Sequence, residues 1–243
     1  MKVDTLVDCE GSFATVSEAF PAVDSDERWW LPVNTVLIRT ADATVLVDTG
    51  LGPQPRTFMA DADAHLHDEL ARLGVAPEHV DVVVHTHLHI DHVGWDGTFP
   101  NARYVVHEQD WSFFMNDASV AERPHLRDKV QPLSNVERIA GETELMTGVR
   151  LLPTPGHTPG HLSVRIESGG DRLVVLGDVV VHELQVADPG IVYVSDHDAT
   201  LAADTRRRVL GQLADEGVRV IVSHFRGSGR FERAGKGFRW AVE

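Results

Sequence analysis

The sequence predicts an α/β fold built from two halves of similar plan. Short runs of β-branched residues alternate with segments of helical periodicity in the first half, and the alternation returns from about residue 149. This pattern favours a layered α/β architecture over an all-β one. The length of 243 residues allows a sizeable core. We therefore expect a single domain, residues 1–243, built from two αβ halves of about 1–130 and 131–243.

Two strands and a helix are expected early in the first half. Residues 34–40 (NTVLIRT) and 43–50 (ATVLVDTG) are short β-branched runs separated by two residues, which indicates neighbouring antiparallel strands. Leucines then recur at i, i+4 and i+7 within residues 58–74, and Gly74 supplies a stop signal. This stretch is therefore expected to form an amphipathic helix.

The rest of the first half predicts two further strands. These are residues 80–84 (VDVVV), a buried run, and 102–107 (ARYVVH), which precedes a helical turn at 108–115. Residues 117–132 are polar, contain prolines and show no clear period. A linker or a mobile flap is expected there.

The second half repeats the plan with strands, a helix and a final strand. The expected strands are residues 149–154 (VRLLPT), 161–167 (HLSVRIE), 172–178 (RLVVLGD) and 218–225 (VRVIVSHF). The sequence SGG between the second and third of these indicates a hairpin turn. Residues 199–217 form the expected helix, with Asp196 or Asp198 as its N-cap and an apolar stripe along one side.

The acidic composition bounds the choice of partners. Lys and Arg total 22 against 37 Asp and Glu, a formal net charge of −15, which repels a phosphate backbone and an anionic membrane surface. We expect neither nucleic acid nor a membrane as a partner, and the sequence leaves homo-oligomerisation open. No apolar run reaches the roughly 18 residues of a membrane helix, and the first residues show no secretion signal, so a cytoplasmic location is expected.

A dense group of metal-binding side chains follows one expected strand. In VVVHTHLHIDHVGW, residues 82–95, these side chains are His87, His89, Asp91 and His92. Buried polar groups need partners and carboxylates need a counter-charge, both of which a divalent ion supplies. Cys9 is the only cysteine in the sequence, so a thiolate cluster cannot hold the metal. Histidine nitrogen and aspartate oxygen suit zinc, and also manganese, iron or cobalt.

Three more side chains of this type end apolar runs in the second half. They are His157 in LPTPGHTPGH, Asp178 in VVLGDVV and His224 in VIVSHF. Sites in layered α/β folds lie beyond the carboxyl ends of the strands, where such residues converge. Seven ligands delivered by four strand ends predict a site for two metal ions.

This constellation resembles the metallo-β-lactamase superfamily, whose signature is a His-x-His-x-Asp-His loop followed by a downstream His, Asp and His. The resemblance spans roughly residues 34–225 and implies that family's four-layer αββα sandwich. It also implies the ligand roles: His87, His89 and His157 for the first metal, Asp91, His92 and His224 for the second, and Asp178 as a bridge. Asp48, in VLVDTG, would brace the histidine loop, and Asp48 with Thr86 would fix histidine tautomers.

The activity implied by the resemblance is hydrolysis by a dinuclear metal centre with a bridging hydroxide. Two divalent ions are expected, Zn²⁺ before Mn²⁺, Fe²⁺ or Co²⁺. Asp91 and Asp178 are the candidate catalytic carboxylates, and Asp178 would pass a proton to the leaving group.

Within the superfamily, THLHIDHVGW and GHTPGH look like the branch of N-acyl homoserine lactonases and similar aryl organophosphate hydrolases. A lactone or ester with an apolar acyl or aryl group is the expected substrate. A phosphotriester hydrolase, a thioesterase, a β-lactamase and, more remotely, a mononuclear-iron sulfur dioxygenase stay open as alternatives. The lactonases place a tyrosine three residues beyond the bridging aspartate, where this chain has Val181, and Tyr193 and His182 are the substitutes considered.

The remaining histidines and aromatic residues receive weaker assignments. His85 is expected in the core, and His161 is expected to make hydrogen bonds behind the metal ligands. Surface positions are expected for His65, His67, His79, His107, His125 and His197. Apolar pocket walls could come from Trp29, Trp30, Trp95, Phe113, Phe114 and Met115, with Trp95 the strongest candidate because it follows the metal loop.

Overall fold

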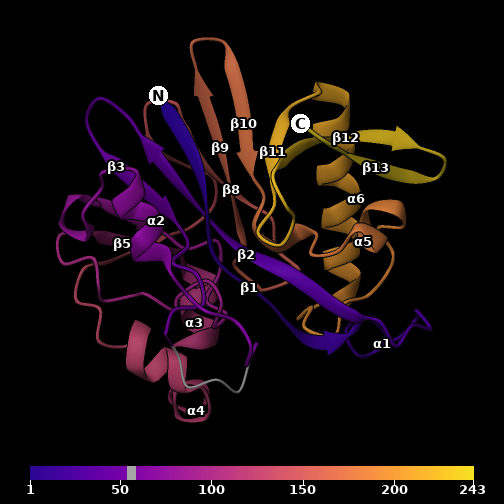
Figure 1. The fold of residues 1–243 in the computed structure, drawn as a ribbon, viewed down its shortest axis with the longest axis horizontal. Helices are drawn as coiled ribbons and strands as arrows, with labels where there is room; N and C mark the ends of the chain where they lie inside the picture. The colour runs from indigo at the N-terminus through magenta and orange to yellow at the C-terminus, as the bar shows by residue number, and fades with distance from the viewer. Residues whose placement is uncertain (54–58) are drawn as a thin grey trace. The chain divides into compact units, whose positions relative to one another are not determined.

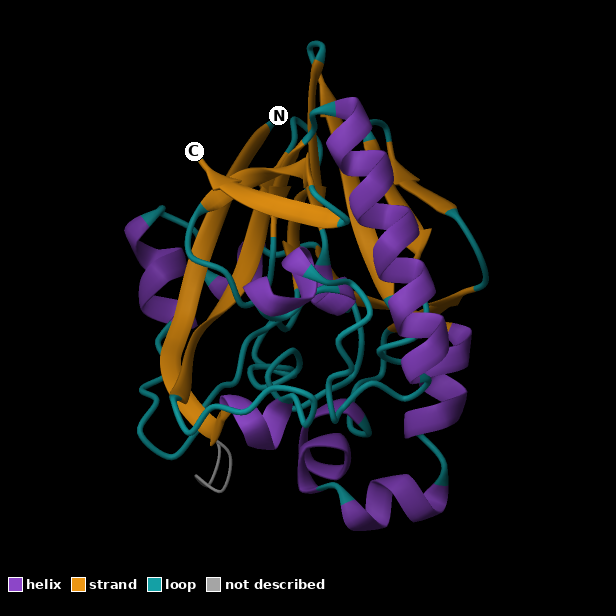
Figure 2. Ribbon diagram, turned by 90° about the vertical axis from the view of Figure 1, so that its right-hand side faces the viewer, coloured by secondary structure: helices purple, strands orange, loops and turns teal. Residues whose placement is uncertain are grey.

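The computed structural model describes residues 1–53 and 59–243 (Figure 1). In this part of the chain, strands form two sheets and helices accompany each of them (Figure 2), so the predicted α/β class is confirmed. The chain divides into two compact units. The first comprises Met1–Gly11 and Pro32–Gly141, and the second comprises Ser12–Leu31 and Glu142–Glu243. Residues 12–31 therefore group with the C-terminal part of the chain, and the single-domain interpretation stays a prediction.

The first sheet has the order β1-β2-β3-β4-β5-β6. Its strands are β1 (Lys2–Thr15), β2 (Arg28–Arg39), β3 (Thr44–Val47), β4 (Val82–Val84), β5 (Arg103–His107) and β6 (Val136–Ile139). β2 and β3 are antiparallel, as predicted, whereas β3 to β6 run parallel. Parallel strands are buried on both faces, and all three valines of β4 are buried. The predicted metal loop begins where β4 ends.

Helix α2 (Leu66–Arg72) is shorter than the helix expected over residues 58–74. Phe58, where that helix was expected to begin, lies outside the described residues. α2 begins where the buried carboxylate of Asp8, on β1, accepts a hydrogen bond from the backbone N–H of Leu66 at 2.9 Å. Local sequence cannot show a cap supplied from 58 positions away. Leu66 and Leu70 pack into the core with residues of β2 to β5.

Most of residues 117–132 are helical, so the expected linker is wrong. After α3 (Glu108–Phe114) the chain forms α4 (Asp117–Glu122) and a short π-helix (Leu126–Val130). Asn116 caps α4 by accepting a hydrogen bond from the N–H of Ser119 at 3.0 Å. Apolar residues of both segments pack against Phe114. Movement of this stretch as a flap stays a prediction.

The second sheet has the order β13-β12-β11-β10-β9-β8-β7. Its strands are β7 (Thr143–Met146), β8 (Val149–Pro153), β9 (Leu162–Ser168), β10 (Asp171–Val175), β11 (Arg219–Ile221), β12 (Ser228–Ala234) and β13 (Gly237–Val242). Gly169 and Gly170, with φ of 61° and 91°, form the predicted hairpin turn between β9 and β10. β10 and β11 run parallel. β11 ends at Ile221, so His224 follows the strand instead of lying within it.

Four helical segments belong to the second unit: α1 (Val16–Ala19), a 3-10 turn (Gly177–Val179), α5 (Glu183–Ala187) and α6 (Ala199–Glu216). Asp198 caps α6, accepting from the N–H of Leu201 at 2.9 Å, so Asp196 is not its N-cap. α6 buries its apolar stripe against residues of β10, β11 and β12. Among the described residues, none of the helices has the length and apolarity needed to cross a bilayer.

Candidate metal centre

The histidine loop after β4 is tied by its backbone to the segment that follows β3. The N–H of Thr49 donates to the carbonyl of His92 at 2.8 Å, and the N–H of Gly94 donates to that of Gly50 at 2.8 Å. A Cβ at Gly94 would lie 1.9 Å from the carbonyl oxygen of Leu51, so this close approach requires glycine. The two segments therefore form one rigid support for the ligands.

Asp48 braces the loop, as predicted. Its φ of 60° is a conformation that aspartate tolerates better than most residues. Its carboxylate accepts three hydrogen bonds, from the Thr86 N–H at 2.7 Å, from the Thr86 hydroxyl at 2.7 Å and from His92 Nδ1 at 2.8 Å. Three donors satisfy this buried charge and fix both residues of the loop.

These hydrogen bonds also determine the histidine tautomers. The Thr86 hydroxyl donates its hydrogen bond to Asp48. The Thr86 oxygen therefore accepts a hydrogen bond from His87 Nδ1 at 3.1 Å. His92 Nδ1 donates to Asp48 in the same way. Each ring therefore carries its proton on Nδ1 and keeps a lone pair on Nε2, the form that binds a metal ion.

The ligand atoms of the first unit lie close together. His87 Nε2 is 3.0 Å from His89 Nδ1, and His92 Nε2 is 3.9 Å from Asp91 Oδ1. All four side chains belong to groups of three His and Asp residues that could hold a metal ion. The ring of Phe114 meets that of His89 edge-on at 5.5 Å and limits its rotation.

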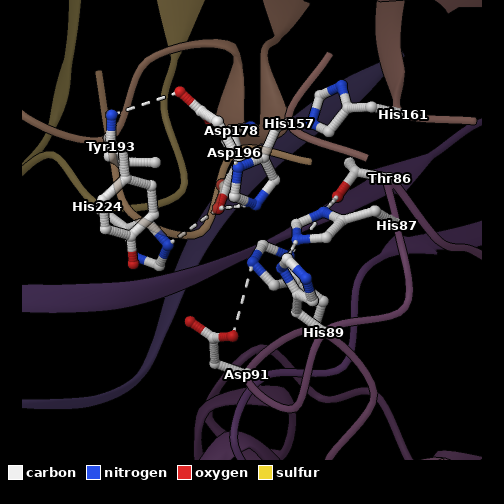
Figure 3. A network of polar contacts seen from close by, with 12 residues as sticks. Thr86, His87, His89, Asp91, His157, His161, Asp178, Tyr193, Asp196 and His224 are labelled. Atoms are coloured by element: carbon white, nitrogen blue, oxygen red, sulfur yellow. Dashed lines mark hydrogen bonds and ion pairs between the residues drawn. The ribbon is translucent and has the colours of Figure 1, made fainter. Parts of the chain in front are cut away.

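The ligand atoms of the second unit centre on Asp178, which follows β10 in the 3-10 turn. Asp178 Oδ2 lies 3.6 Å from His157 Nε2 and 3.3 Å from His224 Nε2. Figure 3 shows Asp178 beside His157 and His224. All three side chains are buried, and each belongs to a group that could hold a metal ion.

The chemistry of these donors fits a divalent cation. His157 Nδ1 donates to Asp196 Oδ1 at 3.1 Å, so in the neutral ring Nε2 carries the lone pair, and it faces the Asp178 carboxylate. Two acceptors that face each other in a buried site repel unless a cation lies between them. Two ligands bound at about 2.0–2.2 Å to one tetrahedral zinc ion are about 3.3–3.6 Å apart. The 3.6 Å and 3.3 Å separations around Asp178 match that spacing.

His161 holds the backbone of Asp178 and has the hydrogen-bonding role predicted for it. Its Nε2 accepts from the N–H of Asp178 at 2.9 Å, and its Nδ1 donates to Thr154 Oγ1 at 2.8 Å. The Thr154 hydroxyl is hydrogen-bonded to the Ser163 hydroxyl. The Ser163 hydroxyl in turn donates a hydrogen bond to the carbonyl of Leu176. Because the backbone N–H occupies the Nε2 lone pair, His161 orients the bridging candidate instead of binding a metal ion.

The sequence did not single out two buried acid–base pairs beside the ligands. His85, in the core as predicted, faces Asp96 with 3.0 Å between His85 Nε2 and Asp96 Oδ2. Burial opposes a charge on His85, but the Asp96 carboxylate outweighs it and raises the pKa of His85 above its ordinary value. The second pair is Arg206 and Asp196, the latter considered only as a helix cap. Arg206 occupies the buried stripe of α6 with Val209, Leu210 and Leu213 at i, i+3, i+4 and i+7, a pattern that could have revealed it.

The residues proposed as pocket walls lie in different environments. Trp95 stacks on His67 with 4.4 Å between ring centroids and donates from Nε1 to Asp8 at 2.8 Å, so it packs within the first unit. Trp30 is 57% exposed. Trp29 is buried beside Tyr193, whose ring lies parallel to that of His157 at 5.9 Å.

One histidine expected at the surface is buried. His107 is 7% exposed and accepts a hydrogen bond from the N–H of Gln109 at the start of α3. Burial lowers the pKa of His107.

Buried histidine and aspartate side chains at strand ends, with tautomers set for coordination, define a metal-binding protein of the α/β class. The family model of the metallo-β-lactamase superfamily matches residues 28–224, and the chain belongs to this superfamily. The resemblance predicted from the histidine loop is thereby confirmed.

Curated relatives include N-acyl homoserine lactonases. Those of Bacillus sp and Bacillus cereus are 34% and 32% identical to this chain over 162 and 163 residues. Each match covers 60% of this chain and 62% of the relative, so the chain spans about three fifths of the length of these relatives.

Solved structures share the fold at lower identity. The structure of AidC, a dizinc quorum-quenching lactonase in complex with a product N-hexnoyl-L-homoserine, has a TM-score of 0.84 at 22% identity and covers 99% of this chain and 94% of that one. The hydrolase AbOPH has a TM-score of 0.85 at 22% identity, with the same coverage.

Proposed function

We propose that this chain is a metal-dependent hydrolase that acts on a lactone or an ester with an apolar acyl or aryl group. The observation that carries the proposal is the control of histidine tautomers by buried acceptors. Asp48, Thr86 and Asp196 accept hydrogen bonds from Nδ1 of His92, His87 and His157, which places the lone pair of each neutral ring on Nε2. This is the tautomer in which a histidine binds a metal ion through Nε2.

The ligand assignment follows the family pattern. The proposed set for one ion is His87, His89 and His157, the set for a second is Asp91, His92 and His224, and Asp178 bridges them. Zinc is the first choice for both, since these nitrogen and oxygen donors suit it, and Mn²⁺, Fe²⁺ or Co²⁺ are alternatives. Two such ions, when held by these residues, would supply Lewis-acid chemistry, lowering the pKa of bound water and polarising the substrate oxygen.

The chain's own carboxylates would handle the proton. His161 holds the backbone of Asp178 by accepting a hydrogen bond from its N–H, which helps to position the residue. Asp178 would carry a proton to the leaving oxygen, a role worth about 10²–10⁴-fold in rate for a positioned acid–base group. Asp91, on the loop beside His92, would hold its metal ion at the fixed distance that this transfer requires.

The lactone or ester assignment is supported by the relatives, which are N-acyl homoserine lactonases. Aromatic rings of the second unit offer an apolar contact beside a ligand, because Tyr193 stacks on His157 and Trp29 packs on Tyr193. The net charge of −15 supports a small-molecule substrate in place of nucleic acid or a membrane, and a cytoplasmic location remains part of the proposal.

One residue keeps a phosphotriesterase as the second candidate. Val181, where lactonases of the branch have a tyrosine, is 2% exposed, and its N–H donates to Gln185. It offers no hydroxyl to a lactone. His182 is half-buried, and its Nδ1 accepts from the N–H of Leu184, so its Nε2 carries a proton that it can donate.

A substrate panel tests the proposal. The zinc-loaded protein is assayed for kcat/KM against N-acyl lactones, aryl esters, phosphotriesters, thioesters and β-lactams. Lactones or aryl esters as the best class support the proposal, and phosphotriesters as the best class support the second candidate. Oxygen consumption with a single bound iron, or hydrolysis of none of these classes, contradicts it.

A further inference from the structure

Arg206 is a charged side chain buried deep within the second unit, close to a candidate ligand. Its side chain is 1% exposed, on the inner face of α6. Burial lowers the pKa of Arg206, and the Asp196 carboxylate opposes part of that shift. A guanidinium stays charged under such conditions, so it needs acceptors around it.

The Arg206 guanidinium donates hydrogen bonds to four acceptors. Nε donates to the carbonyl of Val179 at 2.7 Å, and Nη1 donates to the carbonyls of Pro189 at 3.0 Å and Ile191 at 3.2 Å. Nη2 donates to Asp196 Oδ2 at 3.2 Å. Val179 directly follows Asp178, so one side chain joins the segment that carries a candidate bridging ligand to the loop of residues 189–196.

The loop of residues 189–196 is also tied to His157. Asp196 Oδ1 accepts from His157 Nδ1 at 3.1 Å, and the N–H of His197 donates to the carbonyl of His157 at 3.0 Å. Tyr193, in the same loop, lies parallel to the His157 ring with 7° between the planes. The position and the tautomer of His157 therefore depend on where this loop lies.

We infer that Arg206 and Asp196 are positioning residues for His157, acting in series from α6 through the loop to the imidazole. Arg206 orients the carboxylate, and the carboxylate accepts a hydrogen bond from Nδ1 of His157, so that Nε2 faces Asp178. The inference rests on the proposed role of His157 as a metal ligand. Partners of this kind change metal affinity by about 10–100-fold when they are removed.

Two substitutions separate the steps. In Asp196→Asn the amide keeps the volume, but its NH₂ must face either Arg206 or His157 Nδ1, both donors, so one of the two contacts is lost. In Arg206→Lys the positive charge remains. A single ammonium group, however, cannot reach all four acceptors that surround the planar guanidinium of the arginine. Arg207→Lys is the matched control, because Arg207 follows on the same helix, is 54% exposed and pairs with Asp204.

The experiment measures the zinc affinity of metal-free protein by competition with a chromophoric chelator. We expect Asp196→Asn and Arg206→Lys each to weaken zinc binding by about 10–100-fold, and the double variant to lose no more than the weaker-binding single variant, because the residues act in series. Arg207→Lys should match the wild type. The visible spectrum of the cobalt-loaded protein should change in the two test variants and stay unchanged in the control.

The melting temperature of each metal-free variant shows whether it is folded. Folded test variants with wild-type zinc affinity and cobalt spectrum overturn the inference, and so do fully additive losses in the double variant. If Arg206→Lys does not fold, Asp196→Asn decides alone. A wild-type protein that binds no zinc would contradict the proposed function itself, a result distinct from failure of the positioning inference.

Discussion

Replacing Asp48 with asparagine tests whether the tautomers of the histidine loop are set by hydrogen bonding. The substitution preserves the shape of the side chain, and asparagine adopts the φ of 60° at this position at least as readily as aspartate. One amide oxygen can still accept from the Thr86 N–H. The amide NH₂ then faces the Thr86 hydroxyl and His92 Nδ1, where the carboxylate had accepted two hydrogen bonds of 2.7 Å and 2.8 Å.

The expected magnitude follows from those two lost contacts. Hydrogen bonds to charged groups contribute about 1.5–3 kcal/mol each, so the free energy of unfolding of the metal-free protein should fall by about 3 kcal/mol or more. For a chain of this size, that corresponds to a decrease of about 6–12 °C in melting temperature. The Nδ1 proton of His92 then faces the amide NH₂ without an acceptor, the ring is no longer held, and zinc affinity should fall by about 10–100-fold.

Chelator competition and thermal unfolding measure the two effects. Asp81→Asn is the control, because the Asp81 carboxylate also accepts a backbone N–H, that of Thr44 at 2.7 Å, but it lies at the surface before β4 and away from the ligands. The control should bind zinc as the wild type does. Wild-type zinc affinity in Asp48→Asn would refute the argument that Asp48 sets the state of His92.

Further predictions concern catalysis and pH. Asp178→Ala should lower kcat by at least about 100-fold on the best panel substrate while the melting temperature shows an intact fold, and full activity would remove its assigned role. His161→Ala should lower zinc affinity by about 10–100-fold, less than His157→Ala, and an equal loss would make His161 a ligand. Burial lowers the pKa values of His107 and His125, so at these two positions the unfolded chain binds more protons than the folded one below pH about 6.5. Stability of the metal-free protein should therefore fall on acidification below that pH, less steeply in His125→Gln, and a melting temperature that rises instead would contradict this.

The sequence predicts best the parts of the fold that local pattern determines. The valines of β4 and the β-branched runs of β2 and β3 form strands that are buried over most of their length, so apolar residues follow one another with few polar interruptions. β1 was not predicted, since its charged residues and Gly11 interrupt any alternation. Its Asp8 is nevertheless buried, and it accepts hydrogen bonds from Leu51, Gly52, Leu66 and Trp95. Contacts of such sequence separation have no local signal.

In the candidate site too, the local sequence reveals some residues and not others. The candidate ligands themselves are recognisable because their spacing is fixed by one short loop and by strand ends. Their supports are less accessible, because Asp196 and Arg206 reach His157 only through a loop whose path depends on tertiary packing. Arg206 could nevertheless have been noticed in the sequence, because it is a charged residue on the apolar face of α6. A charge within a buried stripe is a useful indicator of a hidden acceptor.

The most direct test of the central claim is the number of metal ions bound per chain. Metal-free protein is dialysed to equilibrium against zinc, and bound zinc is measured by mass spectrometry alongside the Asp178→Ala variant. The account predicts two zinc ions per wild-type chain and weakened binding of both in the variant, since Asp178 is assigned to both ions. A wild-type chain that binds one ion or none, or a variant that still binds two with unchanged affinity, would contradict it.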